Sequence, residues 1–279
     1  MSHVTAGPQL TADSVLSASA FGDDPGRWPL PSAHDHQQLW LRAVAAGGQG
    51  RYGTANGCLA ELLRGRPGVR LASLALSTRA SFLRQLGWHW HAHDWDGRAW
   101  SRAGDDPEAG VDALTGLAAD ALGVGRLRAS AALLHRATGL ADGAGTVPPR
   151  VGIRLAWVAA ELAMAGGDGT AAVRHARRGV ELADDALPAL RRHRVKSDVV
   201  LAAALCCAGD LAGSRAVADA ALAAADGYAL TPLRWAVACL LADIGSVAHS
   251  PGAIAEVRDG SAEFVTRHGG RWRMPGGRP

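Results

Sequence analysis

Apolar residues recur at spacings of three and four through most of the chain, and strict alternation of apolar and polar positions is absent between the turns. Small-residue turns separate these periodic stretches. The pattern predicts six antiparallel helix pairs, at about 35–63, 71–100, 108–140, 150–183, 187–225 and 230–267. We therefore expect an all-α protein with no central β-sheet.

One turn followed by a helix returns along the chain. In its clearest form Gly209 and Asp210 open a helix that carries small residues at Ser214, Ala218 and Ala221. Related stretches begin at Gly50, Gly125 and Gly167; the last two intervals, up to Gly209, are 42 residues each, and the 75 residues from Gly50 to Gly125 leave room for two units. Such a period is typical of a stacked helical repeat.

This pattern resembles the second helix of the tetratricopeptide repeat (TPR) family. The first unit matches it best, with Gly50, Tyr52, Ala55, Leu59, Leu62 and Pro67 in the family's order and spacing. Later units match more loosely, at Gly125, Leu127, Ser130 and Leu134; at Gly167, Gly169, Ala172 and Ala176; and at Gly209, Leu211, Ser214 and Ala218. The resemblance covers residues 35 to 267 and implies an α-solenoid, a TPR-like right-handed superhelix of about six helix pairs.

The second pair departs from the family pattern. Asp94-Trp95-Asp96 imitates the turn between the two helices, but Ala99 then stands one position too late. The register of this pair stays open.

The ends of the chain differ in composition from the repeats. Residues 1–33 are rich in Ser, Ala, Gly, Asp and Pro and predict a flexible arm with a short helix near 12–20, in which Trp28 caps the first repeat. Residues 34–267 form the repeat domain, with a candidate hinge at 142–149. Residues 268–279 predict a basic, flexible tail.

The basic residues are almost all arginine, since Lys196 is the only lysine among 29, and the net charge is +3. A GC-rich bacterial genome explains this bias. Acidic residues are interleaved with the arginines, which disfavours a nucleic-acid-binding surface. Neither a leader nor a membrane span is evident, so we expect a cytoplasmic protein. The four cysteines (Cys58, Cys206, Cys207 and Cys239) are expected to be reduced and buried.

The sharpest local cluster of potential ligands is His89, His91 and His93, followed by Asp94 and Asp96. Alternate histidines share a face only on a strand, whereas a helix would point them in different directions. We expect packing rather than a metal site here. The chain also lacks a phosphate-binding loop and a nucleophile elbow, so we expect neither a cofactor nor an enzyme.

A binding surface remains. In the resembling family the first helix of each pair lines an inner groove, and this correspondence gives Gln37, Trp40, Asp112, Thr115, Arg154, Trp157, Glu161 and Lys196 as candidate contact residues. Tryptophan and arginine are favoured in binding hot spots.

Three functions compete. The first is a non-catalytic scaffold that binds a protein or peptide in the groove, which an exposed Trp157 would favour. The second is a regulatory module that binds a small ligand between repeats and acts through a partner, which a closed apolar cavity between pairs three and four would favour. The third, a metal-dependent enzyme, needs three histidine nitrogens about one point. The sequence leaves the partner and the oligomeric state, including a homo-oligomer, open.

Overall fold

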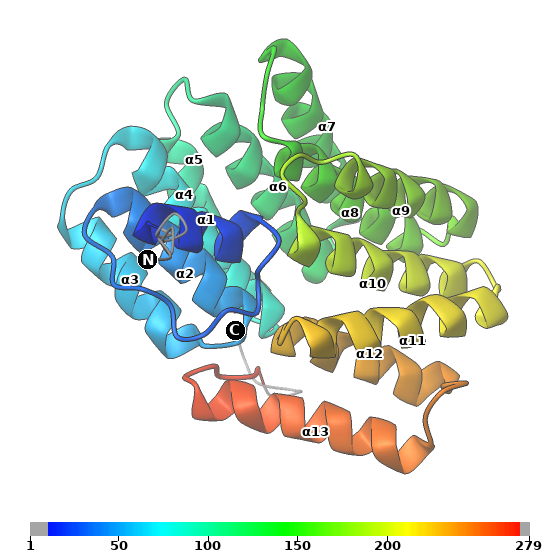
Figure 1. The fold of residues 1–279 in the computed structure, drawn as a ribbon. Helices are drawn as coiled ribbons and strands as arrows, with labels where there is room; N and C mark the ends of the chain where they lie inside the picture. The colour runs from blue at the N-terminus through cyan, green and yellow to red at the C-terminus, as the bar shows by residue number, and fades with distance from the viewer. Residues whose placement is uncertain (1–10, 274–279) are drawn as a thin grey trace, which may run out of the picture.

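The computed structural model describes residues 11–273, and these residues form helices without any strand (Figure 1). In chain order the helices are α1 (Ala12–Phe21), α2 (His36–Gly48), α3 (Tyr52–Arg64), α4 (Val69–Gln85), α5 (His89–Arg102), α6 (Pro107–Gly123), α7 (Leu127–Gly143), α8 (Pro149–Ala165), α9 (Gly169–Asp184), α10 (Arg191–Cys207), α11 (Leu211–Gly227), α12 (Thr231–Ile244) and α13 (Pro251–Arg267). The expected all-α architecture is confirmed.

Consecutive helices from α2 onward pack as six antiparallel pairs, and each pair also packs against the next, which makes an α-solenoid. We call α2, α4, α6, α8, α10 and α12 the inner helices and their partners, α3, α5, α7, α9, α11 and α13, the outer helices. The six predicted ranges agree with these pairs to within a few residues.

Five of the pairs turn on a glycine with positive φ: Gly50, Gly87, Gly125, Gly167 and Gly209. In each turn the amide of the residue after the glycine donates to a carbonyl five positions back, as Arg51 does to Ala46. This is the Schellman ending of a helix, in which the left-handed conformation favours glycine. The interval from Gly50 to Gly125 leaves room for two units, and Gly87 forms the turn of the second of these.

A small residue five positions after each of these glycines holds the paired helices together. These residues are Ala55, Ala92, Ser130, Ala172 and Ser214, and all five are completely buried. Because the side chain is one or two heavy atoms long, the neighbouring backbone can approach closely. The repeat is thus defined by a glycine that ends one helix and a small residue in the first turn and a half of the next.

The second pair corrects one expectation. Asp94-Trp95-Asp96 is not a turn but the middle of α5, which begins at His89 directly after the Gly87 turn. The family-like small position is Ala92, not Ala99, although Ala99 is buried as well. Asp94 and Asp96 resemble a turn sequence, but the turn of this pair is at Gly87.

The N-terminal segment, expected to be a flexible arm, packs onto the repeats from residue 11 onward. Helix α1 buries Leu16 and Ala20 against the first pair. Its last residue, Phe21, contacts Trp40 on α2 at 5.2 Å between ring centroids, and the carbonyl of Gly22 accepts the amide of Arg191 at 3.2 Å. The segment therefore connects α2 with α10. The first ten residues of the expected arm lie outside the described range.

The C-terminal segment 268–273 also differs from the expected flexible tail. The carbonyl of His268 accepts the amide of Gly53 at 2.7 Å, and that of Arg271 accepts the indole Nε1 of Trp88 at 2.6 Å. The amide of Arg273 donates to the carbonyl of Leu86 at 2.9 Å. This segment, which we call the C-terminal strap, ties the last pair to the first two; the rest of the tail, 274–279, lies outside the described range.

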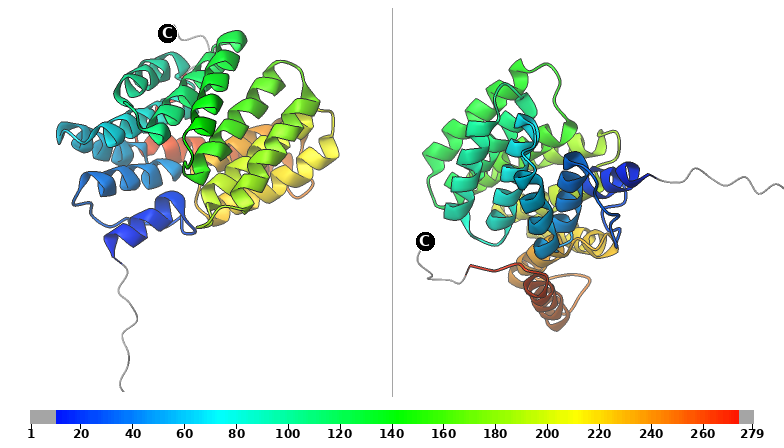
Figure 2. Two further views of the ribbon diagram at one scale, coloured as in Figure 1. Left: turned by 90° about the horizontal axis from the view of Figure 1, so that it is seen from above. Right: turned by 90° about the vertical axis from the view of Figure 1, so that its left-hand side faces the viewer.

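The solenoid thus curves back on itself, and α12 and α13 lie beside the first helix pair (Figures 1 and 2). At this contact Val265 of α13 joins the same buried cluster as Tyr52 and Leu59 of α3. The molecule is a closed ring of helix pairs rather than an open superhelix. The loop at 144–148 between α7 and α8 is one of the connections around this ring, and its role as a hinge stays a prediction.

Two further observations bear on the sequence-based expectations. No helix within residues 11–273 is both long and apolar enough to cross a membrane. All four cysteines are free, but only Cys58 is buried, and Cys207 is exposed, because it lies at the solvent-facing end of α10.

Candidate functional site: the central cavity of the ring

The inner helices of all six pairs surround a cavity of about 430 Å³, which we call the central cavity. It is also lined by Phe21 at the end of α1, by His89 at the start of α5 and by Trp272 of the C-terminal strap. The same contacts that close the ring therefore complete the cavity wall. A volume of this size is in the range of small-molecule sites.

Seven of the eight residues expected from the sequence line the central cavity: Trp40, Asp112, Thr115, Arg154, Trp157, Glu161 and Lys196. They come from four different helices and meet because each occupies the inward face of its helix. Gln37 does not line the cavity; it is half-buried in the first turn of α2. Whether these residues bind a partner is a separate question from their position.

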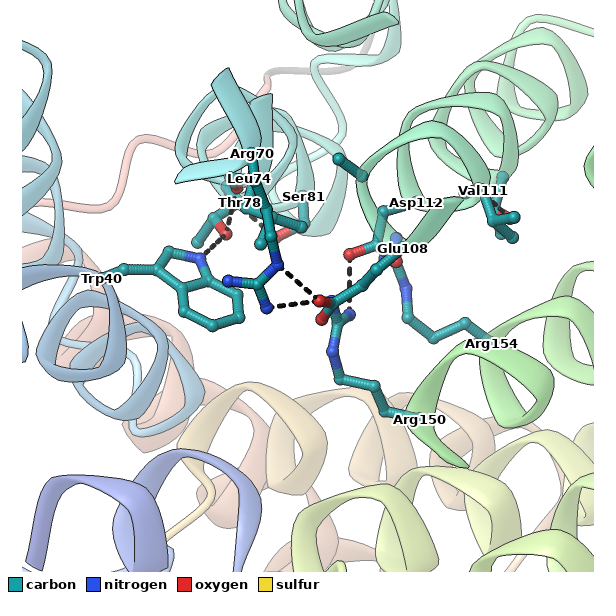
Figure 3. A network of polar contacts seen from close by, with 12 residues as sticks. Trp40, Arg70, Leu74, Thr78, Ser81, Glu108, Val111, Asp112, Arg150 and Arg154 are labelled. Carbon is teal, nitrogen blue, oxygen red and sulfur yellow. Dashed lines mark hydrogen bonds and ion pairs between the residues drawn. The ribbon is translucent and has the colours of Figure 1, made fainter. Parts of the chain in front are cut away.

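A network of ion pairs runs across three inner helices at the cavity wall (Figure 3). Arg70 of α4 donates from Nε to Oε2 of Glu108 on α6 at 2.9 Å, and Arg150 of α8 reaches Oε1 of the same carboxylate at 2.5 Å. Arg150 also contacts Oδ2 of Asp112 at 2.7 Å, and Arg154 pairs with the other oxygen. The network joins repeats two, three and four through charge.

These charges are stable as ions although they are buried. Burial opposes the ionisation of Asp112, but Arg150 and Arg154 together outweigh it and lower the pKa of that carboxyl group. Burial likewise disfavours the Arg150 cation, yet Asp112 and Glu108 outweigh it and raise the pKa of Arg150. Asp112 and Arg150 therefore depend on their partners to remain charged in a water-poor place.

A second network, behind the cavity wall, holds two carboxylates around one guanidinium. Arg84 of α4 contacts Oδ2 of Asp96 on α5 at 2.9 Å and pairs with Asp120 on α6. Burial first, and the repulsion of Asp120 second, raise the pKa of Asp96 to about 7 against the attraction of Arg84. One cation compensates two buried anions only in part, so Asp96 binds a proton as the pH falls below about 7.

Aromatic rings supply the apolar part of the cavity wall. Trp157 stacks on His193 with centroids 5.5 Å apart and donates from Nε1 to Oγ of Ser197 at 2.8 Å. Trp235 of α12 and Trp272 of the strap contact each other at 4.3 Å. The indole of Trp40 donates to Oγ1 of Thr78 at 3.0 Å, so these rings are held in fixed orientations.

His193 lies between these aromatic rings as a neutral group. It is buried, and its pKa is well below the usual value, first because of burial and then because of repulsion by Arg192, Arg150 and Arg154. The electrostatic environment of the cavity is therefore positive on this side. Lys196, one turn further along α10, is paired with Glu161 at 3.2 Å.

The histidine cluster does not form a metal centre. Within residues 11–273, no group of three or more His, Cys, Asp or Glu side chains is arranged to hold a metal ion. Because the cluster lies in the first turn of a helix, His91 and His93 are exposed whereas His89 lines the central cavity. The pKa of His89 is lowered, mainly by burial and then by Arg84 and Arg273.

Sequence reasoning missed several residues of the site, among them Phe21, Arg150, His193, Trp235 and Trp272, and the most consequential one is Arg192. It lines the central cavity from the first turn of α10, four residues before Lys196. A helical spacing of four from a predicted inner-face residue was a usable signal. The surrounding run of arginines, Arg191 to Arg194, made this position look like a solvated surface.

Charged groups on fixed positions and aromatic rings equip the central cavity, which is partly open to solvent, to bind a molecule. Among the described residues no Ser, Thr or Cys side chain is hydrogen-bonded to a histidine, which is the pairing that activates a nucleophile. The chain matches no known protein-family model and no curated protein sequence.

Proposed function

We propose that this protein is a non-catalytic binding module that takes up a small organic molecule in the central cavity and acts through a partner protein. The observation that carries the proposal is the closure of the ring around a cavity of about 430 Å³. Its wall combines aromatic surface with a few oriented polar groups, as small-molecule sites do.

The lining of the cavity by residues from all six helix pairs favours this proposal over a scaffold that binds an extended peptide. The candidate groove residues lie inside the ring, and Trp157 is half-buried rather than exposed. A peptide that runs along the superhelix would have to break the contacts of the C-terminal strap and of α1. A small molecule needs only a path into the cavity.

The repeat architecture supports a finer assignment to the TPR-like solenoids. The turn glycines, the buried small residue five positions later and the match of Gly50, Tyr52 and Ala55 to the family motif support this assignment. Proteins built from such repeats act by binding, which agrees with the proposed role.

A cavity-filling variant tests the proposal. Ala119 lines the cavity from α6, so Ala119→Trp should occupy part of its volume, whereas Ala132→Trp on the exposed face of α7 adds the same side chain outside the ring. A library of small organic molecules is screened against each protein by ligand-observed NMR. We expect molecules that bind the native protein and Ala132→Trp but not Ala119→Trp.

Equal binding to all three proteins would place the ligands elsewhere and contradict the proposal. A native protein that binds no library member would contradict it as well. Circular dichroism and thermal melting of Ala119→Trp are needed beside the screen, because loss of binding is informative only in a folded variant.

A further inference from the structure

Arg192 differs from every other cation that lines the central cavity. Arg84, Arg150, Arg154 and Lys196 each have a carboxylate partner. Arg192 has no ion pair or hydrogen bond with any residue in the described range 11–273, and its Nε is buried without a partner. The cavity therefore holds one positive charge that the protein itself does not balance.

The position of this charge is built into the ring. The side chain of Arg192 extends from α10 to the end of α2, where Gly48 gives it room: a Cβ at that glycine would lie 2.9 Å from Cδ of Arg192. A side chain at residue 48 would displace the arginine. The absence of a side chain there allows the guanidinium to lie against the backbone of the opposite helix.

An unbalanced charge in this place is costly. Burial first, and then repulsion by Arg150 and Arg154, lower the pKa of Arg192 to about 10. Arg192 is half-buried with its Nε enclosed, so its unpaired charge is only partly solvated and destabilises the folded protein. An anion that binds in the cavity would pair with Arg192 and remove this cost. The binding of an anion would therefore be more favourable than its other contacts alone would make it.

Other groups around Arg192 favour a molecule that is only partly polar. Ser77 and His193 line the cavity, and each has one buried polar atom, Oγ and Nδ1 respectively, without a partner in the described chain. Next to His193 stand the rings of Phe21, at 6.1 Å, and Trp157, at 5.5 Å. A ligand with one anionic end and a flat apolar body would use both kinds of surface.

We propose that the central cavity recognises an organic carboxylate, whose single negative charge pairs with Arg192 and whose apolar body packs against the aromatic rings. This inference rests on the proposed function and specifies its ligand class. A carboxylate matches the guanidinium in geometry and in charge. A phosphate monoester carries almost two charges, of which Arg192 can balance one.

The test compares probes that share an apolar body. 1-Naphthaleneacetate carries a carboxylate, 1-naphthaleneacetamide replaces it with a neutral amide of the same shape, and 1-naphthyl phosphate carries a dianion. Their dissociation constants are measured by isothermal titration calorimetry. We expect the carboxylate to bind at least about tenfold more tightly than the amide, the effect of one hydrogen-bonded ion pair, and more tightly than the phosphate.

Three variants assign the effect to its residue. Arg192→Met removes the charge and keeps an unbranched apolar stem, Arg192→Gln removes the charge and keeps a polar end, and Arg191→Met removes an exposed charge from the neighbouring position. The preference for the carboxylate should fall to about onefold in both Arg192 variants and persist in Arg191→Met. The unliganded Arg192→Met protein should melt at the same or a higher temperature than the native protein.

Several outcomes would overturn the inference. Equal affinity of the native protein for the carboxylate and the amide, or binding of neither, excludes a carboxylate site, and neither result depends on how the variants fold. If both Arg192 variants still prefer the carboxylate over the amide, the anion binds at another residue. If the phosphate binds more tightly than the carboxylate, the proposed ligand class is wrong. If this test fails but the Ala119→Trp screen succeeds, the cavity remains a binding site for small molecules and only the assignment of carboxylates as its ligands is wrong.

Discussion

Helices α6 and α7 belong to the same pair and have the same length, yet they differ in what surrounds them. Nearly all of α6 is buried, including Glu108, Asp112 and Asp120, whereas α7 buries only Ser130 and Ala137. An inner helix has neighbours on three sides and the cavity on the fourth, so its charges lose water and depend on each other. The charged side chains of α7 remain solvated and contribute little.

The largest expected effect follows from this difference. Asp112→Ala removes the shared partner of Arg150 and Arg154 and leaves two buried guanidiniums with fewer partners, which should lower the free energy of unfolding by about 3–5 kcal/mol. Urea denaturation measures the loss. Glu181→Ala on the outer helix α9 breaks an exposed pair with Arg178 and should cost less than about 1 kcal/mol. Similar losses in both variants would contradict the distinction between inner and outer charges.

The outer helices are sensitive at one position of their own. Ala172 of α9 is completely buried against α8 and α10, so Ala172→Phe should cost roughly 1–3 kcal/mol through overpacking. The matched change Ala129→Phe on the exposed face of α7 should have little effect. An unchanged urea midpoint for Ala172→Phe would show that the repeat tolerates large residues at its small position.

The Arg84 network predicts a pH dependence for the inner side of the ring. The pKa of Asp96 is raised from its ordinary value of 3.8 to about 7, so the folded chain binds more protons than the unfolded chain between about pH 4 and 7. The contribution of Asp96 to stability therefore falls as the pH rises through this window, and it is constant above it. Because asparagine imitates the protonated acid, Asp96→Asn should gain on the order of 1–2 kcal/mol relative to the native protein between pH 5 and pH 8.

Denaturation of both proteins at the two pH values measures this gain, and the difference between them cancels the histidines that titrate in the same range. Asp105→Asn, at an exposed position in the loop before α6, is the control. A difference between native and Asp96→Asn protein that does not change with pH would mean that Arg84 keeps both carboxylates ionised.

The smallest expected effect concerns the histidines of α5. Because His91 and His93 are exposed and His89 faces the cavity, they cannot bind one metal ion together without unwinding the helix. Treatment with a chelator should leave the thermal midpoint unchanged. A fall of several degrees that zinc reverses would contradict this expectation.

The sequence predicted the helix pairs well because their signals are local. Gly125, Gly167 and Gly209 mark turns that a single left-handed residue determines, and inner-face positions such as Trp157 and Lys196 were carried over from the resemblance to the repeat family once the turns fixed the register. The register of the second pair could not be predicted in the same way, since Asp94 and Asp96 imitate a turn inside a helix. Only packing distinguishes the two readings, because Asp96 is needed beside Arg84.

Ring closure could not be predicted from local signals. It depends on the small rotation between successive repeats, summed over six pairs, and on contacts between residues far apart in the sequence. Of the two segments that close the ring, α1 is rich in alanine and serine and the C-terminal strap in glycine and arginine, and both compositions are common in flexible ends. The role of Arg192 could not be predicted for a related reason. Whether this arginine has a carboxylate partner depends on the contact between α10 and α2, which are far apart in the sequence.

The C-terminal strap also determines when the binding site comes into existence. The hydrogen bond from Trp88 to Arg271 joins residues 183 positions apart, whereas the repeats of an open solenoid assemble through neighbours alone. Closing so long a loop costs chain entropy that only a nearly complete stack of helices can offset. During synthesis the helix pairs can therefore form one after another on the ribosome, but the cavity wall is complete only after Trp272 has emerged.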